Sequence, residues 1–238
     1  MNSSTPSRPN QTQSERALLE DIDSTIRSSS LSRRFVEHCY PTLIEKQGLE
    51  DAGYRDAFPH LLCDVSAEGQ ACPWCLSPAV CYHTFIALRG ARLSPRIKIT
   101  ARNHCYRNER EVVPGRRQIE FEMRELVVVG EESWIEDQIQ FWESQIGRLA
   151  NRFGIVASWK PATDPFFLPN SKGRALMQRL LDTKREYCLR DGLAIASINR
   201  HHDYFAKRFS IQSTTDQPVH SACIAFGLDR WAWAAGQA

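Results

Sequence analysis

Near the C-terminus the sequence reads SACIAFGLDRWA over residues 221–232, a strand-like alternation that ends at a glycine and continues as a helix-like segment. Residues two apart share one face of a strand, so Ser221, Cys223 and Ala225 point to the same side. Gly227 allows a tight exit from the strand, and Arg230 enters the following helix. The segment is compatible with a buried core cysteine beside an ordinary helix start, or with a thiol and a guanidinium over one pocket.

The 238-residue chain is 42% hydrophobic and has a formal net charge of +2, from 30 basic and 28 acidic side chains. This composition is typical of one globular domain with a substantial core, and it provides no strong basic field for nonspecific nucleic-acid binding. The sequence contains neither 18 consecutive apolar residues nor the features of a signal peptide. We expect a soluble, cytoplasmic protein with no membrane partner, in which some of the eight cysteines are metal ligands or reactive thiols.

The N-terminal part of the chain divides into a polar tail and a helical segment. Residues 1–13 cannot bury enough apolar surface to order themselves, so we expect a disordered tail. Thr12 and Glu15 have the spacing of a capping box, and apolar residues then recur at helical spacing over 14–28. The whole segment 14–53 is expected to be mostly helical.

Strands dominate the prediction for the main domain, residues 54–238. Alternating apolar residues around a Pro114-Gly115 turn predict an antiparallel hairpin over 96–129, and the clearest helical period predicts a helix over 133–150. The other expected elements are a helical stretch over 32–52 with a break near Pro41, an extended segment over 58–62, a helix over 171–190, and strands near 154–159, 193–199, 207–213 and 219–226. This order indicates an α+β architecture, an antiparallel sheet flanked by helices.

One carboxylate on the second strand of the hairpin has an unusual position. Glu125 shares its parity with Ile119, Phe121 and Met123, so it lies on the more apolar face of the strand. A carboxylate there is costly unless it is hydrogen-bonded, paired with a cation or bound to a metal. Both a salt bridge to an arginine and a metal site satisfy this requirement.

Two sets of metal ligands are compatible with the sequence, because thiolates and a carboxylate together suit zinc. A local set would be a knuckle-like structural zinc site formed by Cys72, Cys75, Cys81 and His83. A distributed set would bring together Cys81, Glu125 and Cys223 from three separate strands. A redox dithiol of the first two cysteines is the weakest interpretation, because no βαβ pattern surrounds the pair.

The hairpin also contains residues suited to a nucleotide. Arg107 and Glu109 end its first strand, a basic loop follows, and Phe121 lies on the return strand. These residues would provide a guanidinium for a phosphate, an acidic hydrogen-bond acceptor and an aromatic platform for a base.

These segments resemble a known class of enzymes. Arg107-Asn108-Glu109 with Phe121 to Glu125 resembles motif 2 of the class II aminoacyl-tRNA synthetases, and Gly227 to Arg230 resembles motif 3. Phe58-Pro59-His60 is similar to the proline that closes motif 1. Finer similarity to the amino acid:carrier-protein ligases, truncated relatives of zinc-dependent seryl-tRNA synthetases, lies in LSPAVCY (76–82), DPFF (164–167), NRHHDYF (199–205) and HSAC (220–223). The resemblance extends from about residue 50 to residue 234.

The resemblance implies a zinc site that captures the amino group of glycine or alanine, with Cys81, Glu125 and Cys223 as ligands. It implies that Arg107 and Arg230 are catalytic. For ATP, it places Arg107 on the α-phosphate, Glu109 on the adenine amino group, Phe121 on one face of adenine, and Arg230 on the other face and the γ-phosphate. It adds Arg117, Gln118 and Lys184 to the ATP site, and Ala194, Ile195, Ala196 and Ser197, with Glu125, to the amino-acid pocket.

The implied reaction is attack of an amino-acid carboxylate on the α-phosphate of magnesium-ATP, followed by transfer of the aminoacyl group to a carrier protein. The acceptor would be the phosphopantetheine thiol of the carrier and not tRNA, and the enzyme would be a homodimer through its motif 1 region. Alternatives are a non-catalytic synthetase paralogue with a binding or regulatory role, and a tRNA-charging enzyme. The four nucleotide residues together disfavour the paralogue, and the balanced charge and missing N-terminal coiled coil disfavour tRNA charging.

Overall fold

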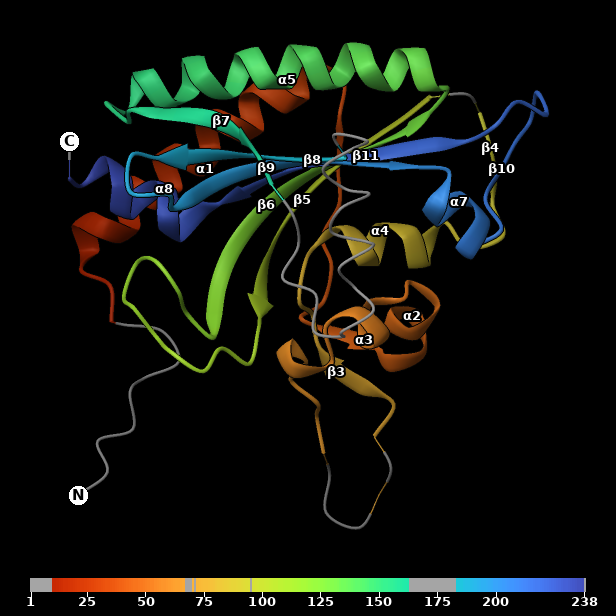
Figure 1. Cartoon of the computed structure of the whole chain (residues 1–238), viewed down its shortest axis with the longest axis horizontal. Coiled ribbons are helices and arrows are strands. Elements are labelled where there is room, and N and C mark those ends of the chain that lie inside the picture. Colours follow the sequence, from red (N-terminus) through yellow and green to blue (C-terminus); the bar gives the residue numbers. More distant parts are fainter. Residues whose placement is uncertain (1–9, 67–69, 71, 95, 163–182, 238) are drawn as a thin grey trace.

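The computed structural model describes residues 10–66, 70, 72–94, 96–162 and 183–237, and its centre is a seven-stranded sheet (Figure 1). In spatial order the strands are β1 (Val36–Glu37), β5 (Arg96–Tyr106), β6 (Glu120–Gly130), β11 (His220–Gly227), β9 (Ala194–His202), β8 (Lys184–Leu189) and β7 (Ala157–Pro161). Only β1 and β5 pair in parallel; the other neighbours are antiparallel. The predicted α+β architecture is confirmed.

The predicted hairpin forms the middle of this sheet. Strands β5 and β6 pair from Arg96 opposite Gly130 to Tyr106 opposite Glu120, without a register shift. Strand β11 pairs with the other edge of β6, so that Ala225 lies opposite Glu125. The strand of motif 2 and the strand of motif 3 are therefore neighbours.

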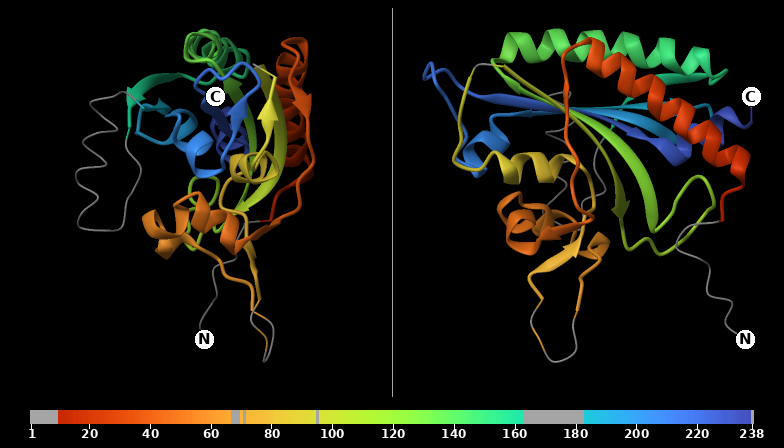
Figure 2. Two further views of the ribbon diagram at one scale, coloured as in Figure 1. Left: turned by 90° about the vertical axis from the view of Figure 1, so that its right-hand side faces the viewer. Right: turned by 180° about the vertical axis from the view of Figure 1, so that it is seen from behind.

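Two long helices cover one face of the sheet, as Figure 2 shows from behind: α1 (Gln13–Ser32) and α5 (Glu132–Arg152). Their apolar stripes bury Ile22 of α1 and Trp142 of α5 in a core that α8 (Leu228–Ala235) completes. The capping box of Thr12 and Glu15 is present, whereas residues 1–9 of the expected disordered tail lie outside the described residues. None of the helices in the described part of the chain has the length and apolar character needed to span a bilayer.

Charged side chains of the sheet are buried beneath α1. Arg124 of β6 is 2% exposed, and its Nε lies 2.6 Å from Oδ1 of Asp23 on α1. Glu122, which is 1% exposed, forms ion pairs with Arg16 of α1 and with Arg102 of β5. These pairs join the N-terminal helix to the central strands, since breaking a buried pair leaves an uncompensated charge.

Smaller elements cover the opposite face of the sheet. Helix α4 (Cys81–Ala87) and helix α7 (Tyr204–Arg208) meet where Phe85 stacks on Phe205, with ring centroids 4.1 Å apart. Beside them lie α2 (Lys46–Asp51), α3 (Tyr54–Ala57), the 3-10 helix η1 (Pro59–Leu61) and the two-stranded pairs β2 (Leu43–Glu45) with β3 (Trp74–Leu76) and β4 (Arg92–Leu93) with β10 (Gln212–Ser213). An open region of the central sheet between these elements forms the floor of the site.

The structure differs from the prediction in the N-terminal segment. Of the helical stretch expected over 32–52, only α2 is helical, because β1 adds to the edge of the main sheet and β2 pairs with β3. The segment 58–62 is not extended: η1 begins at Pro59, where the fixed φ of proline suits the first turn of a helix.

Two further predictions are wrong in part. Residues 171–182 of the expected helix 171–190 lie outside the described residues, and its end is strand β8, in which Tyr187 packs on Trp159 with ring centroids 5.1 Å apart. The strand expected over 207–213 begins as helix α7, and only its end is β10. Phe205 of α7 and Phe209, which caps the end of this helix, are four residues apart, and both rings stack on Phe85.

Candidate active site

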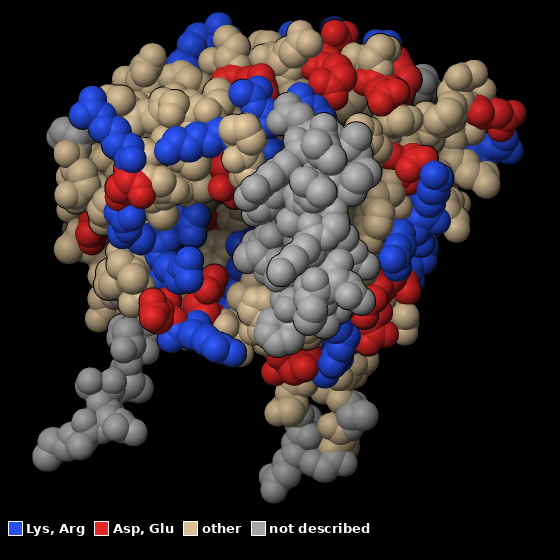
Figure 3. Space-filling view, in the orientation of Figure 1, with Lys and Arg blue, Asp and Glu red and all other residues tan. Residues whose placement is uncertain are grey.

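A cavity of about 790 Å³ opens on the face of the sheet that carries Phe121, Met123 and Glu125 of β6. Lys and Arg side chains gather around a hollow on this face (Figure 3). The cavity wall includes all the residues that the resemblance assigns to metal, ATP and amino-acid binding: Cys81, Arg107, Glu109, Arg117, Gln118, Phe121, Glu125, Lys184, Ala194, Ile195, Ala196, Ser197, Cys223 and Arg230. Residues from distant parts of the sequence therefore share one site.

The expected metal ligands form a compact group inside this cavity. The donor atoms of Cys81, Glu125 and Cys223 lie within 4.8 Å of one another, and the three residues are at most 7% exposed. The prediction that Cys81 lies on a strand is wrong. Cys81 is the first residue of helix α4. The first amides of a helix have no partner within it, and the Cys81 amide donates a hydrogen bond of 2.8 Å to Oε2 of Glu125.

The three groups interact electrostatically. Burial, with the nearby Cys223, raises the pKa of Glu125 to about 8, although the Cys81 amide opposes this shift. The hydrogen bond between the two thiols lowers the pKa of Cys223 and raises the pKa of Cys81. Two sulfurs and a carboxylate buried side by side are a donor set that a zinc ion fits.

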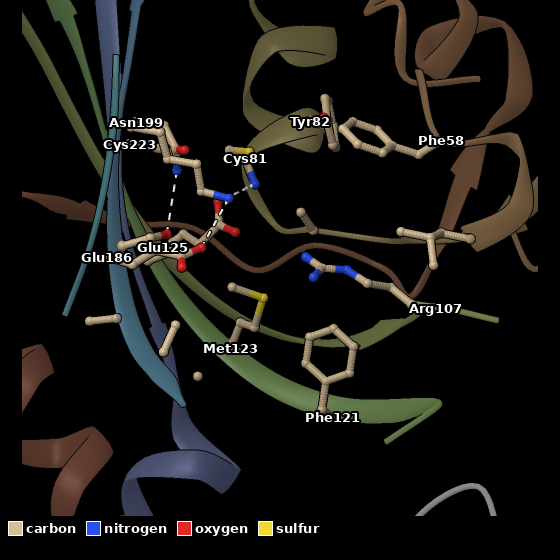
Figure 4. Close-up of a pocket in the computed structure, with 18 of the residues that line it drawn as sticks. Phe58, Cys81, Tyr82, Arg107, Phe121, Met123, Glu125, Glu186, Asn199 and Cys223 are labelled. Atoms are coloured by element: carbon tan, nitrogen blue, oxygen red, sulfur yellow. Dashed lines mark hydrogen bonds and ion pairs between the residues drawn. The ribbon is translucent and has the colours of Figure 1, made fainter. Parts of the chain in front are cut away.

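Asn199 is a neighbour of this group that the sequence analysis did not assign to the site. It lies on β9 directly opposite Cys223 of β11, and its Nδ2 donates a hydrogen bond of 3.5 Å to Cys223 Sγ (Figure 4). Asn199 is two residues from the predicted pocket residue Ser197 and so lies on the same face of the strand. This spacing could have identified it from the sequence. Asn199 therefore orients one sulfur, and its hydrogen bond helps to lower the pKa of Cys223.

The local metal site proposed from the sequence is not formed. Cys75 is buried in β3, and its thiol donates to the carbonyl oxygen of Ile44 at 3.7 Å. Within the part of the chain that the structure describes, Cys72 and Cys75 do not join Cys81 and His83 in a group of metal donors. Cys75 instead packs in the apolar cluster of Ile44, Leu49 and Tyr54.

The residues expected to bind ATP surround another part of the cavity. The Arg107 guanidinium carbon lies 5.1 Å from the Phe121 ring centroid, and its Nε donates to the Pro78 carbonyl at 3.1 Å (Figure 4). Arg230 donates to the carbonyl oxygens of Arg116 at 2.7 Å and Ala194 at 2.8 Å. Burial and the neighbouring Arg107 lower the pKa of Arg230 to about 10. Two half-buried cations, one of which lowers the pKa of the other, are suited to a polyanion such as a triphosphate.

The loop between β5 and β6 holds itself in place with its own side chains. Gln118 is 6% exposed; its Oε1 accepts from the Gly115 amide at 2.9 Å, and its Nε2 donates to the Glu120 carbonyl at 3.1 Å. The distance from Nη1 of Arg117 to Oε2 of Glu109 is 3.8 Å. In this structure Gln118 shapes the loop, while Arg117 and Glu109 line the cavity.

The helix after motif 3 is firmly anchored to the sheet. Trp231, the residue after Arg230, is fully buried, and its indole Nε1 donates to the Ile195 carbonyl at 3.0 Å. This contact fixes α8 against β9, so the backbone of Arg230 has a defined position beside the cavity.

The sequence comparisons identify relatives of known name. No protein-family model matches the chain. It is 28% identical over 223 residues to amino acid–[acyl-carrier-protein] ligases 1 and 2 of Bradyrhizobium diazoefficiens; the alignments cover 81% of this chain and 68% and 66% of those proteins. This chain thus spans about two thirds of their length.

The structural comparisons identify the fold. The SerRS of M. kandleri, solved in complex with A. aeolicus tRNASec, has a TM-score of 0.80 at 18% identity, covering 98% of this chain and 54% of that chain. Prolyl-tRNA synthetase from Cryptosporidium parvum, complexed with halofuginone and AMPPNP, also has a TM-score of 0.80, at 12% identity, covering 99% of this chain and 48% of that chain. The chain has the fold of the class II aminoacyl-tRNA synthetases, and its sequence is similar to amino acid–[acyl-carrier-protein] ligases.

Proposed function

We propose that this chain is a ligase that activates glycine or alanine with magnesium-ATP and passes the aminoacyl group to the phosphopantetheine thiol of an acyl carrier protein. One observation carries the proposal: a single cavity combines the Cys81, Glu125 and Cys223 donor group with the cations Arg107 and Arg230. An amino acid and a triphosphate are the ligands that these two chemistries select. The similarity to amino acid–[acyl-carrier-protein] ligases supports a carrier protein as the acceptor.

The donor group would recognise the α-amino end of the substrate. Cys81, Glu125 and Cys223 would hold zinc, which when bound supplies a Lewis acid for the amino group. The proposed amino-acid pocket is formed by Glu125 and by the β9 residues Ala194, Ile195, Ala196 and Ser197. Discrimination by size would then depend on the walls of the pocket, since the amino group is common to all α-amino acids.

In the first step, a carboxylate oxygen of the amino acid attacks the α-phosphorus of ATP, and the bond from phosphorus to the pyrophosphate oxygen breaks. Arg107 binds the α-phosphate, Arg230 binds the γ-phosphate and one face of adenine, Phe121 stacks on the other face, and Glu109 accepts from the adenine amino group. The remaining ATP contacts come from Arg117, Gln118 and Lys184. No protein nucleophile is needed, because positioning and charge stabilisation carry the step.

In the second step, the sulfur of phosphopantetheine attacks the carbonyl carbon of the aminoacyl-adenylate, AMP leaves, and the aminoacyl thioester forms. The chain would act as a homodimer through the segment Phe58–His60. Analytical ultracentrifugation of the purified chain tests this part of the proposal, and a monomer at enzymatically active concentrations would contradict it.

Amino-acid-dependent exchange between ATP and pyrophosphate, measured with each of the twenty amino acids, tests the first step. We expect exchange with glycine or alanine, and then an aminoacyl thioester by mass spectrometry when a phosphopantetheinylated carrier is added. Exchange followed by charging of tRNA instead would identify a tRNA-aminoacylating enzyme. No exchange with any amino acid would support a non-catalytic paralogue.

A pair of cysteine variants tests the role of the donor group. Cys223→Ser should abolish exchange, because it removes one of the three donors, whereas Cys72→Ser should leave exchange unchanged. Loss of exchange in Cys72→Ser but not in Cys223→Ser would instead support the local set of Cys72, Cys75, Cys81 and His83 as the functional metal site. Circular dichroism of both variants checks that each remains folded.

A further inference from the structure

A second group of metal donors lies at the end of β9 and β11 that is remote from Arg230. Glu132 is the first residue of α5, His202 is the last residue of β9, and His220 is the first residue of β11. Their donor atoms lie within 4.8 Å of one another. In the described ranges only one other triad of His, Cys, Asp or Glu meets this criterion: the donor group at the cavity.

The pairing of β9 with β11 brings the two imidazoles together. The register shifts next to His220: Ser221 lies opposite His202, but Ala222 lies opposite Arg200. The extra residue on β9 is a bulge, which redirects the end of the strand, and His202 then has a left-handed backbone with φ 49°. Histidine tolerates this conformation better than most residues do, but it is still uncommon.

The distances leave room for an ion between the three side chains. Nδ1 of His202 and Nδ1 of His220 lie 3.7 Å and 3.9 Å from the same Oε1 of Glu132. Both distances are too long for a direct hydrogen bond. With zinc bonds of about 2.0–2.1 Å in a tetrahedron, neighbouring ligand atoms lie roughly 3.4 Å apart. A small contraction would therefore complete three bonds.

Two ring nitrogens of the group, Nδ1 of His220 and Nε2 of His202, are buried and lack a hydrogen-bond partner among the described residues, and one of them, His220 Nδ1, is a nitrogen that faces Glu132. The Glu132 side chain is 63% exposed and the His202 side chain 42% exposed, so water and ions reach the group from outside. An ordinary ion pair would use one imidazolium at hydrogen-bond distance, whereas here two rings face one carboxylate oxygen.

We propose that Glu132, His202 and His220 form a second, solvent-accessible site for a divalent transition metal, with zinc as the ion and water in the fourth position. Two imidazoles and one carboxylate suit zinc and its neighbours in the first transition row and not calcium or magnesium, which prefer oxygen ligands. The ion would join the start of α5 to β9 and β11. His202 also lines the cavity, but none of the three ligands is a residue assigned to the proposed reaction, so the inference does not depend on the proposed function.

Metal titration of the full chain distinguishes the two sites. After removal of metal, we expect the chain to bind two equivalents of zinc in equilibrium dialysis. With cobalt as a spectroscopic probe, one equivalent should produce thiolate-to-cobalt charge-transfer absorption, because its site contains sulfur, and the other should produce only the weaker ligand-field bands. Binding of a single equivalent that produces the charge-transfer band would overturn the proposal. A single equivalent without this band would support it and would count against zinc at the cavity site.

Single variants assign each equivalent to its residues. His202→Asn, in which asparagine tolerates the left-handed backbone, and His220→Asn should each bind one equivalent less and keep the charge-transfer band, which also shows that the fold is intact. Cys223→Ser should lose the band and keep the other equivalent. Two equivalents in His202→Asn and His220→Asn would contradict the assignment.

A matched control separates metal binding from the loss of an ordinary histidine–glutamate pair. Nδ1 of His104 on β5 lies 3.0 Å from Oε1 of Glu120, without a second imidazole in a donor group. His104→Asn should still bind two equivalents. A loss equal to that of His202→Asn would show that the titration reports surface histidines in general.

Discussion

Glu125 shows how a single residue connects the fold to its chemistry. Its parity on the strand predicts that it needs a partner, and the structure provides one in the amide of Cys81 at the start of α4. A backbone amide can satisfy a carboxylate without neutralising it, unlike an arginine. Glu125 therefore keeps its capacity to bind a cation next to two sulfurs.

The hydrogen bond from Asn199 to Cys223 should strengthen metal binding. Asn199→Ala removes the donor that orients and stabilises the sulfur, so we expect zinc affinity at the cavity site to fall by about 10–100-fold. Competition with a chromophoric chelator measures this change. Asn103→Ala is the matched control, because the Asn103 side-chain amide also donates a hydrogen bond, but to the carbonyl of Pro41. Equal affinities in the two variants would show that Asn199 does not support the site.

At the scale of elements, the β5–β6 loop contacts helix α8 at Arg230 and at Trp233. The Arg116 carbonyl of the loop accepts from Arg230, and the Arg116 guanidinium carbon lies 4.9 Å from the ring centroid of Trp233 on α8. Gly115 lies directly against the same indole ring. The position of the loop is thus coupled to the position of the cation that we assign to ATP.

Replacing Gly115 should disturb this coupling. A Cβ at Gly115 would lie 2.3 Å from Cδ1 of Trp233, and its φ is +70°, whereas Gly90 has φ +68° and nothing within 4 Å of such a Cβ. Gly115→Ala and Gly90→Ala should both lose roughly 1 kcal/mol from backbone strain. Only Gly115→Ala should raise the KM for ATP in the exchange assay. An equal KM in both variants would separate the loop from ATP binding.

The long elements could be predicted from the sequence, and the short ones could not. The β5–β6 hairpin and α5 have enough residues for their period to be unambiguous. Strand β1 has only two residues, and its pairing of Val36 with Ile99 depends on the edge of a sheet that local sequence does not describe. The placement of Cys81 was mistaken for a similar reason, because a buried cysteine suits a strand and a helix start equally well.

The expected cavity residues came from matching several motifs to a family, since spacing alone left the local and distributed metal sets open. Asn199 was overlooked as a site residue because its role depends on which strand lies beside β9. Glu132, His202 and His220 gave no signal as a group, because they are far apart in the sequence and only the bulge in β9 brings the rings together.

At the scale of the whole molecule, buried charges join the N-terminal helix to the sheet. Asp23 and Arg124 are 101 positions apart in the sequence, and both are nearly inaccessible. Arg102 and Glu122 extend the same network toward the surface. Helix α1 is therefore fixed in position by charge as well as by its apolar stripe.

Breaking this network from one side should destabilise the entire fold. Arg124→Met leaves Asp23 buried without its main partner, and we expect the free energy of unfolding to fall by about 3–5 kcal/mol. Denaturant unfolding measures the change. The double variant Asp23→Leu with Arg124→Met removes both charges and should regain much of the stability. A double variant less stable than Arg124→Met would show that the pair is not the source of the loss.

The wide separation of Cys81, Glu125 and Cys223 in the sequence has a consequence for the order of events during folding. Glu125 is 44 positions from Cys81 in the sequence. Cys223 comes near Glu125 only when strand β11 pairs with strand β6. Bringing such distant ligands together closes long loops, which costs conformational entropy. Binding of an ion does not offset this cost before the sheet has formed. Zinc would therefore arrive after the β6–β11 pairing and not nucleate it. A chain synthesised without zinc should fold first and accept the ion later, so the refolding rate should be independent of zinc concentration.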